Sequence, residues 1–176
     1  SDLIMNEDID EEMRREFPAE IQKSTLLLTG LVNSMLEVAN LDVSEDKLPC
    51  EPVDIRNMCM QEMEKISPKP RIKYQLDITE DTLFIPTNAQ YLTMVIEHLL
   101  NNANKFTEEG FIALGYKVNL SKNQICISVT DSGCGIPKEK QGLVFERFEK
   151  LNEYAQGTGL GLSICKLIVH KWKGSI

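Results

Sequence analysis

Histidine, tryptophan and long apolar runs are scarce in this chain of 176 residues, which has two histidines, one tryptophan and five cysteines. No apolar run approaches the roughly 20 residues that a membrane-spanning helix needs, and the N-terminus has no secretory signal pattern. The cysteines form no C-x-x-C pair, and with so few histidines a zinc site is not expected. We therefore expect reduced cysteines in a reducing compartment.

Basic residues are also in short supply. The chain has 27 acidic and 19 basic residues, which gives a net charge of −8. Nucleic-acid-binding domains usually carry a clustered basic excess, so nucleic acid is not expected as the main partner. Hydrophobic residues make up 42% of the chain, a normal share for a globular protein. The length fits one α/β domain with a helical extension.

The stretch from Leu92 to Phe106 has the clearest helical pattern of the chain. Its apolar residues recur at helical spacing, which predicts a stripe packed on a core. His98, Asn102 and Lys105 form a second stripe, where a carboxamide can bind a hard cation and a lysine can meet phosphate. An amphipathic helix with an ordinary polar flank is the alternative for this stretch alone. The predicted core stripe is Leu92, Ile96, Leu99, Ala103 and Phe106.

Three short segments follow this helix. They are residues 131–136 (DSGCGI), 145–148 (FERF) and 157–162 (GTGLGL). The first comes after an apolar run that predicts a buried strand, and the third opens a helical pattern whose first N–H groups can bind an anion. The third segment lacks the Gly-Lys-Ser/Thr of a Walker loop and the third glycine of the dinucleotide fingerprint. Taken singly, a plain turn and a glycine-rich hinge remain the alternatives.

Together with NNANKF at 101–106, these segments resemble the N, G1, F and G2 boxes of sensor histidine kinases, which belong to the GHKL (Bergerat-fold) ATPases. The resemblance covers about residue 52 to the C-terminus, and the order and spacing of four boxes make it specific. It implies an ATP site with Mg²⁺. Asn102 would be the metal ligand, Lys105 would support the phosphates and Asp131 would accept from the adenine amine.

The resemblance also implies a catalytic role for His98 beside Asn102. This N-box position is commonly Asn in sensor kinases and Glu in hydrolysing GHKL members, whereas the chemotaxis kinases use a histidine there. Phe145 and Phe148 would anchor a lid whose mobile part is 151–157, which we expect to become ordered with nucleotide. The implied nucleotide-binding residues are Asn102, Lys105, Asp131, Gly133, Gly135, Ile136, Phe145, Phe148, Gly157, Thr158, Gly159, Leu160, Gly161 and Leu162.

The N-terminal part predicts a long helix from about residue 11 to 41, with an apolar seam at heptad spacing. In the family this position is the second helix of the dimerisation and phosphotransfer hairpin. We therefore assign 1–45 to a partial dimerisation and histidine-phosphotransfer region without its acceptor helix. Residues 46–176 are assigned to the catalytic ATP-binding domain, without its C-terminal hairpin. Because a lone helix is marginal in water, we expect weak self-association through the seam residues Ile21, Leu28, Leu31, Met35 and Val38.

The remaining patterns predict the order βαββαββα. We expect Asp54 to cap the helix at 55–66, Thr87 or Asn88 to cap the helix at 92–106, and broken helical character at 138–151. The order suggests one mixed sheet with helices on one face, which is a two-layer α/β sandwich and, by resemblance, the Bergerat fold. The other predicted elements are strands at 48–53, 71–78, 83–86, 111–118 and 124–129 and a helix at 160–173.

The family's phosphoacceptor box, which resembles His-Glu-x-Arg-Thr-Pro, does not occur in this chain. His98 falls in the implied ATP site, and His170 is expected at the surface. The family register would place the box just before Ser1. The resemblance therefore implies the ATP-binding catalytic core of a two-component sensor histidine kinase. It would transfer the γ-phosphate of ATP to a histidine on a helix outside this chain, for onward transfer to a response-regulator aspartate.

Several further expectations follow from the resemblance. The partners would be ATP, the receiver domain of a response regulator and a second copy in a homodimer. The location would be cytoplasmic, with a membrane reached only through segments outside this chain, and this chain alone would not autophosphorylate. The first alternative is an ATP-hydrolysing GHKL protein, disfavoured by His98 in place of Glu. The second is a non-catalytic nucleotide-binding or dimerising regulatory module.

Overall fold

The computed structural model describes residues 49–78, 82–149 and 158–176, together with scattered positions between 21 and 39. The described positions of that N-terminal stretch are helical. Of the predicted seam, only Ile21 is described, and it is 50% exposed. The rest of the seam and the predicted lid at 151–157 lie outside the described residues, so the division into 1–45 and 46–176 stays a prediction.

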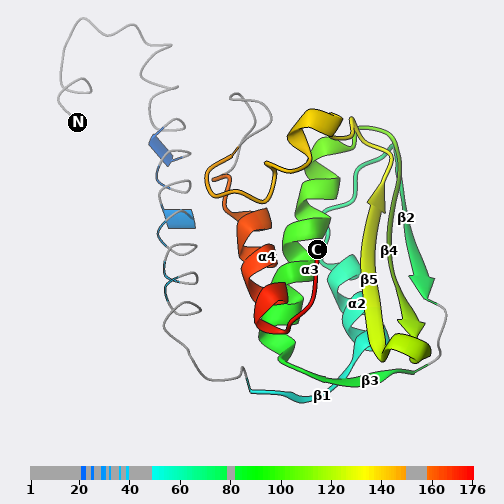
Figure 1. Cartoon of the computed structure of the whole chain (residues 1–176). Helices are drawn as coiled ribbons and strands as arrows, with labels where there is room; N and C mark the ends of the chain where they lie inside the picture. Colours follow the sequence, from blue (N-terminus) through cyan, green and yellow to red (C-terminus); the bar gives the residue numbers. More distant parts are fainter. Residues whose placement is uncertain are drawn as a thin grey trace, which may run out of the picture.

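The described elements follow the predicted order of strands and helices (Figure 1). No end of an element differs from its predicted position by more than three residues. They are β1 (Glu51–Asp54), α2 (Ile55–Glu64), β2 (Ile72–Ile78), β3 (Phe84–Thr87), α3 (Ala89–Phe106), β4 (Gly110–Asn119), β5 (Gln124–Asp131) and α4 (Gly161–Lys171).

The described strands form two sheets, which corrects the prediction of one mixed sheet. A three-stranded sheet has the order β2-β4-β5, with β2 parallel to β4 and β4 antiparallel to β5. The strands β1 and β3 pair separately and antiparallel, with Pro52 opposite Pro86. Proline has no N–H and cannot donate to a ladder. Because of these two prolines, the β1-β3 pair is poorly suited to form hydrogen bonds with a strand of the larger sheet.

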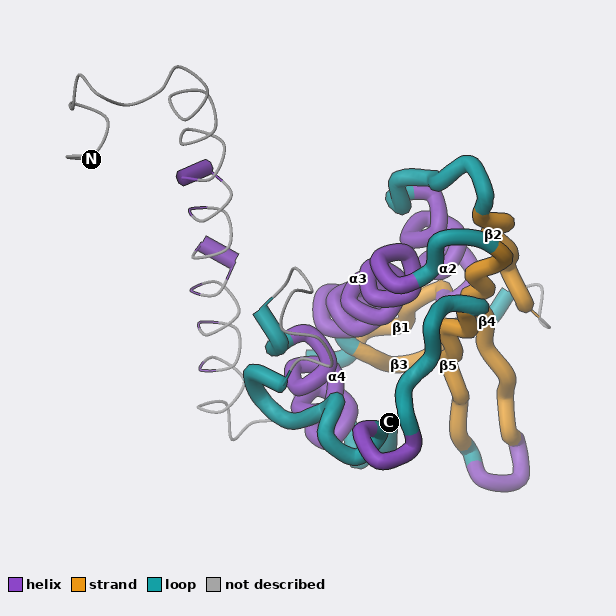
Figure 2. Tube along the Cα trace, turned by 90° about the horizontal axis from the view of Figure 1, so that it is seen from above, coloured by secondary structure: helices purple, strands orange, loops and turns teal. Residues whose placement is uncertain are grey.

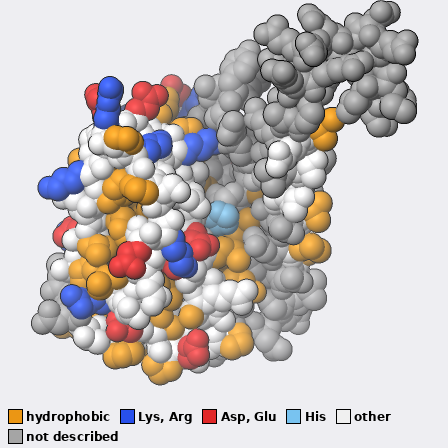
Figure 3. Space-filling view, turned by 180° about the vertical axis from the view of Figure 1, so that it is seen from behind, with side chains coloured by type: hydrophobic (Ala, Val, Ile, Leu, Met, Phe, Trp, Pro, Cys, Tyr) orange, Lys and Arg blue, Asp and Glu red, His pale blue; other side chains and the backbone are white. Residues whose placement is uncertain are grey.

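The helices α2, α3 and α4 all lie on the same side of the three-stranded sheet (Figure 1), and the view from above shows α4 beside α3 (Figure 2). This layering confirms the predicted α/β sandwich. No helix in the described ranges is long and apolar enough to cross a bilayer. On the face shown in Figure 3, described Lys and Arg side chains alternate with acidic ones over the surface.

Side-chain caps fix the starts of α2 and α3. Asp54 Oδ1 accepts a hydrogen bond from the Asn57 backbone N–H at 3.0 Å. Asn88 Oδ1 accepts from the Tyr91 N–H at 3.0 Å. Each cap satisfies one of the N–H groups that a helix leaves unpaired at its start. The predicted cap of α2 is confirmed, and of the two candidates for α3 the cap is Asn88.

The helix α3 packs against two apolar clusters, and this corrects part of the predicted core stripe. The side towards the sheet and α2 buries Ile96 and Leu100, which are 0% and 1% exposed. Leu99 instead packs against the second cluster, formed with α4. Phe106 is 39% exposed. A single helical stripe predicts one partner layer, whereas α3 has a neighbour on two sides.

Candidate functional site

The polar stripe of α3 runs along the second half of the helix. His98 and Asn102 are partly buried, one turn apart, and Lys105 is exposed in the last turn. The Lys105 ammonium lies 4.7 Å from the centroid of the neighbouring Phe106 ring. The stripe therefore presents an imidazole, a carboxamide and a cation on one side of the helix, as its spacing predicts.

The His98 ring is enclosed by the start of α4. A Cβ built on Gly161 would lie 3.2 Å from His98 Nδ1. His98 Nε2 is buried and has no hydrogen-bond partner among the described residues. Burial lowers the pKa of His98 below its ordinary value of 6.5, and the nearby negative charge of Glu97 opposes that shift only in part. The ring is therefore neutral near pH 7 and has one nitrogen available for a further partner.

The loop after β5 lies against the C-terminal end of α3. Asp131, the last residue of β5, accepts a hydrogen bond from the Gly133 N–H at 2.8 Å. The Cys134 N–H donates to the Phe106 carbonyl at 3.4 Å. A Cβ on Gly133 would lie 2.5 Å from that same carbonyl oxygen. Only glycine allows this close approach, and the loop leaves the Asp131 side chain exposed at the end of the sheet.

Ser132 fixes the same loop to the start of β4. Its Oγ accepts from the Phe111 N–H at 2.8 Å and donates to the Glu109 carbonyl at 3.2 Å.

The two glycines flanking Cys134 differ in their surroundings. Gly133 is crowded by Phe106, whereas Gly135 has a φ of +67° and open space around a built Cβ. The loop is thus anchored on its first half and open on its second, where Ile136 is 39% exposed.

The aromatic segment at 145–148 lies against the glycine segment that opens α4. The Phe148 N–H donates to the Gly159 carbonyl at 2.9 Å. Gly159 has a φ of +71°, and a Cβ there would lie 2.8 Å from the Phe148 carbonyl carbon. A second contact joins Glu146 Oε1 to Lys166 Nζ of α4 at 3.2 Å. Before these residues, helical structure is limited to a 3₁₀ turn at Lys138–Lys140 within the described part of 138–149.

The first turn of α4 offers free backbone N–H groups. Its cap position is Leu160, and no described side chain caps it. The Leu160 side chain is 2% exposed and packs in the cluster with α3, so Leu160 can meet a ligand only through its backbone. The Thr158 hydroxyl accepts from the Leu160 N–H at 3.3 Å. An uncapped helix start is a favourable position for phosphate.

The structure thus brings the predicted site segments together around α3. The loop at 131–136 meets its last residue, the glycine segment meets His98, and the aromatic segment meets the glycine segment. Gly157 lies outside the described residues. The roles of the individual site residues stay predictions.

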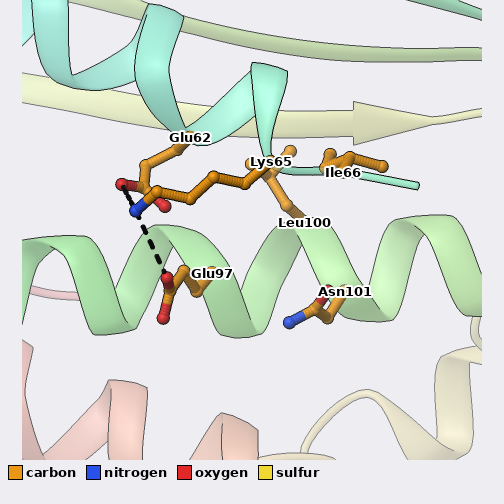
Figure 4. A pocket seen from close by; sticks show the side chains of 6 residues that line it. All are labelled: Glu62, Lys65, Ile66, Glu97, Leu100 and Asn101. Carbon is orange, nitrogen blue, oxygen red and sulfur yellow. Dashed lines mark hydrogen bonds and ion pairs between the residues drawn. The ribbon is translucent and has the colours of Figure 1, made fainter. Parts of the chain in front are cut away.

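A groove of about 240 Å³ lies between α2 and α3 (Figure 4). Lys65 spans it, with Nζ 2.7 Å from Glu62 Oε1 and 3.6 Å from Glu97 Oε1. Glu97 therefore points towards α2 and not towards Asn102. The groove is lined by Glu62, Lys65, Ile66, Glu97, Leu100 and Asn101.

Sequence patterns did not indicate a polar network at the end of α3, formed by Lys69, Tyr74 and Asn104. Asn104 lies 35 positions from Lys69 and 30 positions from Tyr74 along the chain, and it pairs with both. No periodicity or motif connects a loop lysine to a helix end at that separation. Only the fold brings them together.

Residues 87–176 match the family model described as histidine kinase-, DNA gyrase B-, and HSP90-like ATPase. The match covers half of the chain and contains all of the predicted site residues. The chain belongs to this ATPase family.

Curated relatives narrow the comparison to sensor kinases. A sensor-like histidine kinase, ycf26 of Pyropia yezoensis, is 31% identical over 97% of this chain and 29% of its own length. The alginate biosynthesis sensor protein KinB of Pseudomonas aeruginosa is 28% identical over 93% of this chain and 29% of its own length. This chain therefore spans less than a third of either relative.

Solved structures show the same fold. Full-length ShkA, in complex with AMPPNP, superposes with a TM-score of 0.74 at 27% identity, over 96% of this chain and 36% of ShkA. The mycobacterial sensor histidine kinase MprB gives a TM-score of 0.58 at 27% identity, over 69% of this chain and 79% of MprB. The fold of this chain is that of histidine kinase catalytic domains.

Proposed function

We propose that this chain is the ATP-binding catalytic core of a two-component sensor histidine kinase. It transfers the γ-phosphate of ATP to a histidine on a helix outside this chain, for onward transfer to a response-regulator aspartate. The observation that carries the proposal is the convergence of two segments on α3. Phe106 accepts from Cys134 at one end of the helix, and Gly161 lies against His98 in its middle.

The proposed nucleotide spans the distance between these two contacts. Asp131 accepts from the adenine amine at the loop after β5, where Gly133 keeps the loop close to α3. The triphosphate extends towards the uncapped start of α4, whose N–H groups favour negative charge. Lys105 adds a point charge on the same side of α3.

Asn102 is the proposed ligand for Mg²⁺. The donor chemistry fits, because Mg²⁺ prefers oxygen ligands and commonly takes only one or two from the protein beside those of the phosphates. Asn102 lies one turn from His98, on the side of α3 where the triphosphate would pass. When bound, Mg²⁺ neutralises charge on the phosphoryl oxygens during transfer.

The neutral ring of His98 argues against the hydrolysing alternative. A hydrolase of this family would need a carboxylate at that position to activate water, and the neighbouring Glu97 is turned towards Lys65. His98 Nε2 is unpartnered among the described residues, and we propose that it orients the attacking group or a phosphate-bound water. The proposed partners beyond ATP are a receiver domain and a second copy of the full protein, joined through the region 1–45.

Calorimetric titration with Mg-ATP tests the nucleotide site. We expect Asp131→Asn and Asn102→Ala each to raise the Kd by about 10- to 100-fold, because losing a hydrogen bond to a charged group costs about 1.5–3 kcal/mol. Asn101→Ala is the matched control, since Asn101 is on the same helix but lines the groove towards α2. Unchanged binding by both site variants would reject the assignment.

Phosphate release separates the kinase proposal from hydrolysis. The chain alone should bind Mg-ATP but release phosphate very slowly, since it lacks both the acceptor box and a catalytic carboxylate. Steady turnover that is lost in Asn102→Ala and kept in Asn101→Ala would favour the hydrolysing alternative. Binding without transfer in the full-length protein would favour the regulatory module.

A further inference from the structure

The C-terminal end of α3 is held by a lysine from the loop between α2 and β2. Lys69 Nζ donates to the carbonyl oxygens of Asn104 and Thr107, the latter at 2.9 Å. The last carbonyls of a helix have no partner within the helix and carry its negative dipole end. Asn104 is in the last turn of α3 and Thr107 is its C-cap residue. Lys69 therefore gives one free helix carbonyl a partner and places a positive charge next to the negative dipole end.

Tyr74 and Asn104 complete the connection. The Tyr74 hydroxyl donates to Asn104 Oδ1 at 2.7 Å and accepts from the Lys69 N–H at 3.1 Å. Asn104 Nδ2 donates to the Ser67 carbonyl at 3.2 Å. Loop, strand β2 and helix end are therefore joined by direct hydrogen bonds, so the helix end cannot shift without breaking several of them.

The two carbonyls held by Lys69 flank Lys105 and Phe106. The Phe106 carbonyl itself accepts from the Cys134 N–H at 3.4 Å and lies 2.5 Å from the position a Cβ on Gly133 would take. Phe106 thus lies in the chain between the two residues whose carbonyls Lys69 holds, and it is contacted by the loop that follows Asp131. Residues 104–107 form the connection between the two.

We propose that Lys69 is a positioning residue for the nucleotide site, acting through the end of α3 on Lys105 and on the loop at 131–136. Tyr74 and Asn104 hold Lys69 in place against the end of α3. The inference rests on the proposed function, because it assigns that loop and Lys105 to nucleotide binding. Lys69 itself contacts no part of the proposed site, so its effect is on geometry and not on contact with ATP.

The test compares Lys69→Met, which keeps the aliphatic stem, with Lys69→Arg, which restores a cation and several donors. Lys73→Met, at an exposed lysine of β2, is the matched control. Mg-ATP affinity is measured by calorimetry at a temperature where every variant is fully folded. We expect the Kd to rise about tenfold in Lys69→Met, to recover mostly in Lys69→Arg and to stay within twofold in Lys73→Met.

A second measurement reports directly on the effect of Lys69 on the loop at 131–136, and it needs no nucleotide. Hydrogen exchange at the Cys134 amide, which donates to Phe106, should be at least threefold faster in Lys69→Met than in the parent and unchanged in Lys73→Met. If Lys69→Met does not fold, Tyr74→Phe removes one hydroxyl from the same network and should raise the Kd about threefold.

The outcomes separate the proposed function from the positioning role of Lys69. If the parent itself does not bind Mg-ATP, the proposed function fails, while faster exchange at Cys134 would still support the positioning contact. If the parent binds and Lys69→Met binds equally well with a lower Tm, Lys69 has a structural role only and the inference is wrong. Equal Kd values for Tyr74→Phe and the parent would contradict the inference in the same way.

Discussion

Gly161 lies against the imidazole of His98, so that a Cβ on Gly161 would be 3.2 Å from Nδ1 and 3.5 Å from Cγ. Gly161 is the first residue of α4, and His98 lies in the second half of α3. This contact brings the anion-binding start of one helix next to the polar stripe of the other. A side chain added at Gly161 must therefore press on the His98 ring, and removing that ring makes room for it.

Gly161→Ala should be destabilising in the parent and stabilising once the ring is removed. Alanine favours a helix over glycine by up to about 1 kcal/mol, but at 3.2 Å the ring must give way. We expect a net loss of about 1 kcal/mol in the parent and a gain of about 0.5 kcal/mol in the His98→Ala background. Urea unfolding of the four proteins measures this coupling as a double-mutant cycle. Additive effects would mean that the ring moves aside without cost.

Stability should fall with decreasing pH because of His98. Its pKa in the folded protein is lowered by burial from 6.5, so the unfolded chain binds a proton more readily than the folded protein does. The stabilisation is complete above pH 6.5 and is lost as the pH falls from there towards the folded pKa. The slope from this one group is at most about 1.4 kcal/mol per pH unit.

The comparison of the parent with His98→Asn isolates that contribution. The free energy of unfolding is measured by urea titration between pH 7.5 and 5, and His170→Asn, at an exposed histidine, is the matched control. The difference between parent and His98→Asn should narrow as the pH falls, whereas the control should follow the parent. A difference that stays constant with pH would show that His98 titrates normally in the folded protein.

Local signals predicted the order of the elements. Asp54 was predicted as one cap, and Thr87 or Asn88 as the other, because short polar side chains before apolar periodic stretches satisfy free N–H groups. The core stripe of α3 was only partly right, because amphipathicity reports which side is apolar and not how many layers cover it. Leu99 faces α4, and Phe106 remains partly exposed.

The tertiary contacts of the site could not be predicted from the sequence. The glycine segments predicted a nucleotide site, but not that Phe106 would lie against Gly133 and His98 against Gly161. The Lys69 network has no local signature, because a lysine after a helix is usually solvated. The sequence also did not indicate that β1 and β3 would pair apart from the larger sheet, with Pro52 opposite Pro86.

Gly159 and Gly135 should differ in their tolerance of alanine. Both have positive φ, +71° and +67°, so each alanine costs about 1–2 kcal/mol in backbone strain. A Cβ on Gly159 would also lie 2.8–3.0 Å from backbone atoms of Phe148 and Glu149, whereas Gly135 faces open space. Gly159→Ala should therefore lower Tm clearly more than Gly135→Ala. Equal shifts in thermal unfolding would mean that the aromatic segment is not fixed against Gly159.

Cysteine reactivity should divide the five thiols of this chain into two classes. Cys50, Cys126 and Cys134 are exposed, whereas Cys59 and Cys165 are fully buried. Burial raises the pKa of Cys59 to about 11, with a smaller contribution from the negative charge of Glu62, and burial raises that of Cys165 to about 12. Since the thiolate is the reactive form, roughly a thousandth or less of either buried thiol is reactive at pH 8.

A thiol reagent should therefore modify three cysteines rapidly and the other two only on unfolding, as followed by mass spectrometry of digested samples. The same experiment reports on the nucleotide site, because Cys134 lies between Gly133 and Gly135 in the loop assigned to adenine. Saturating Mg-ATP should slow modification of Cys134 by about tenfold or more and leave Cys50 and Cys126 unchanged as internal controls. In Asp131→Asn the protection should be lost at the same ATP concentration, because weaker binding leaves the loop exposed. Protection of all three exposed thiols, or of none while calorimetry shows binding, would place the nucleotide away from this loop.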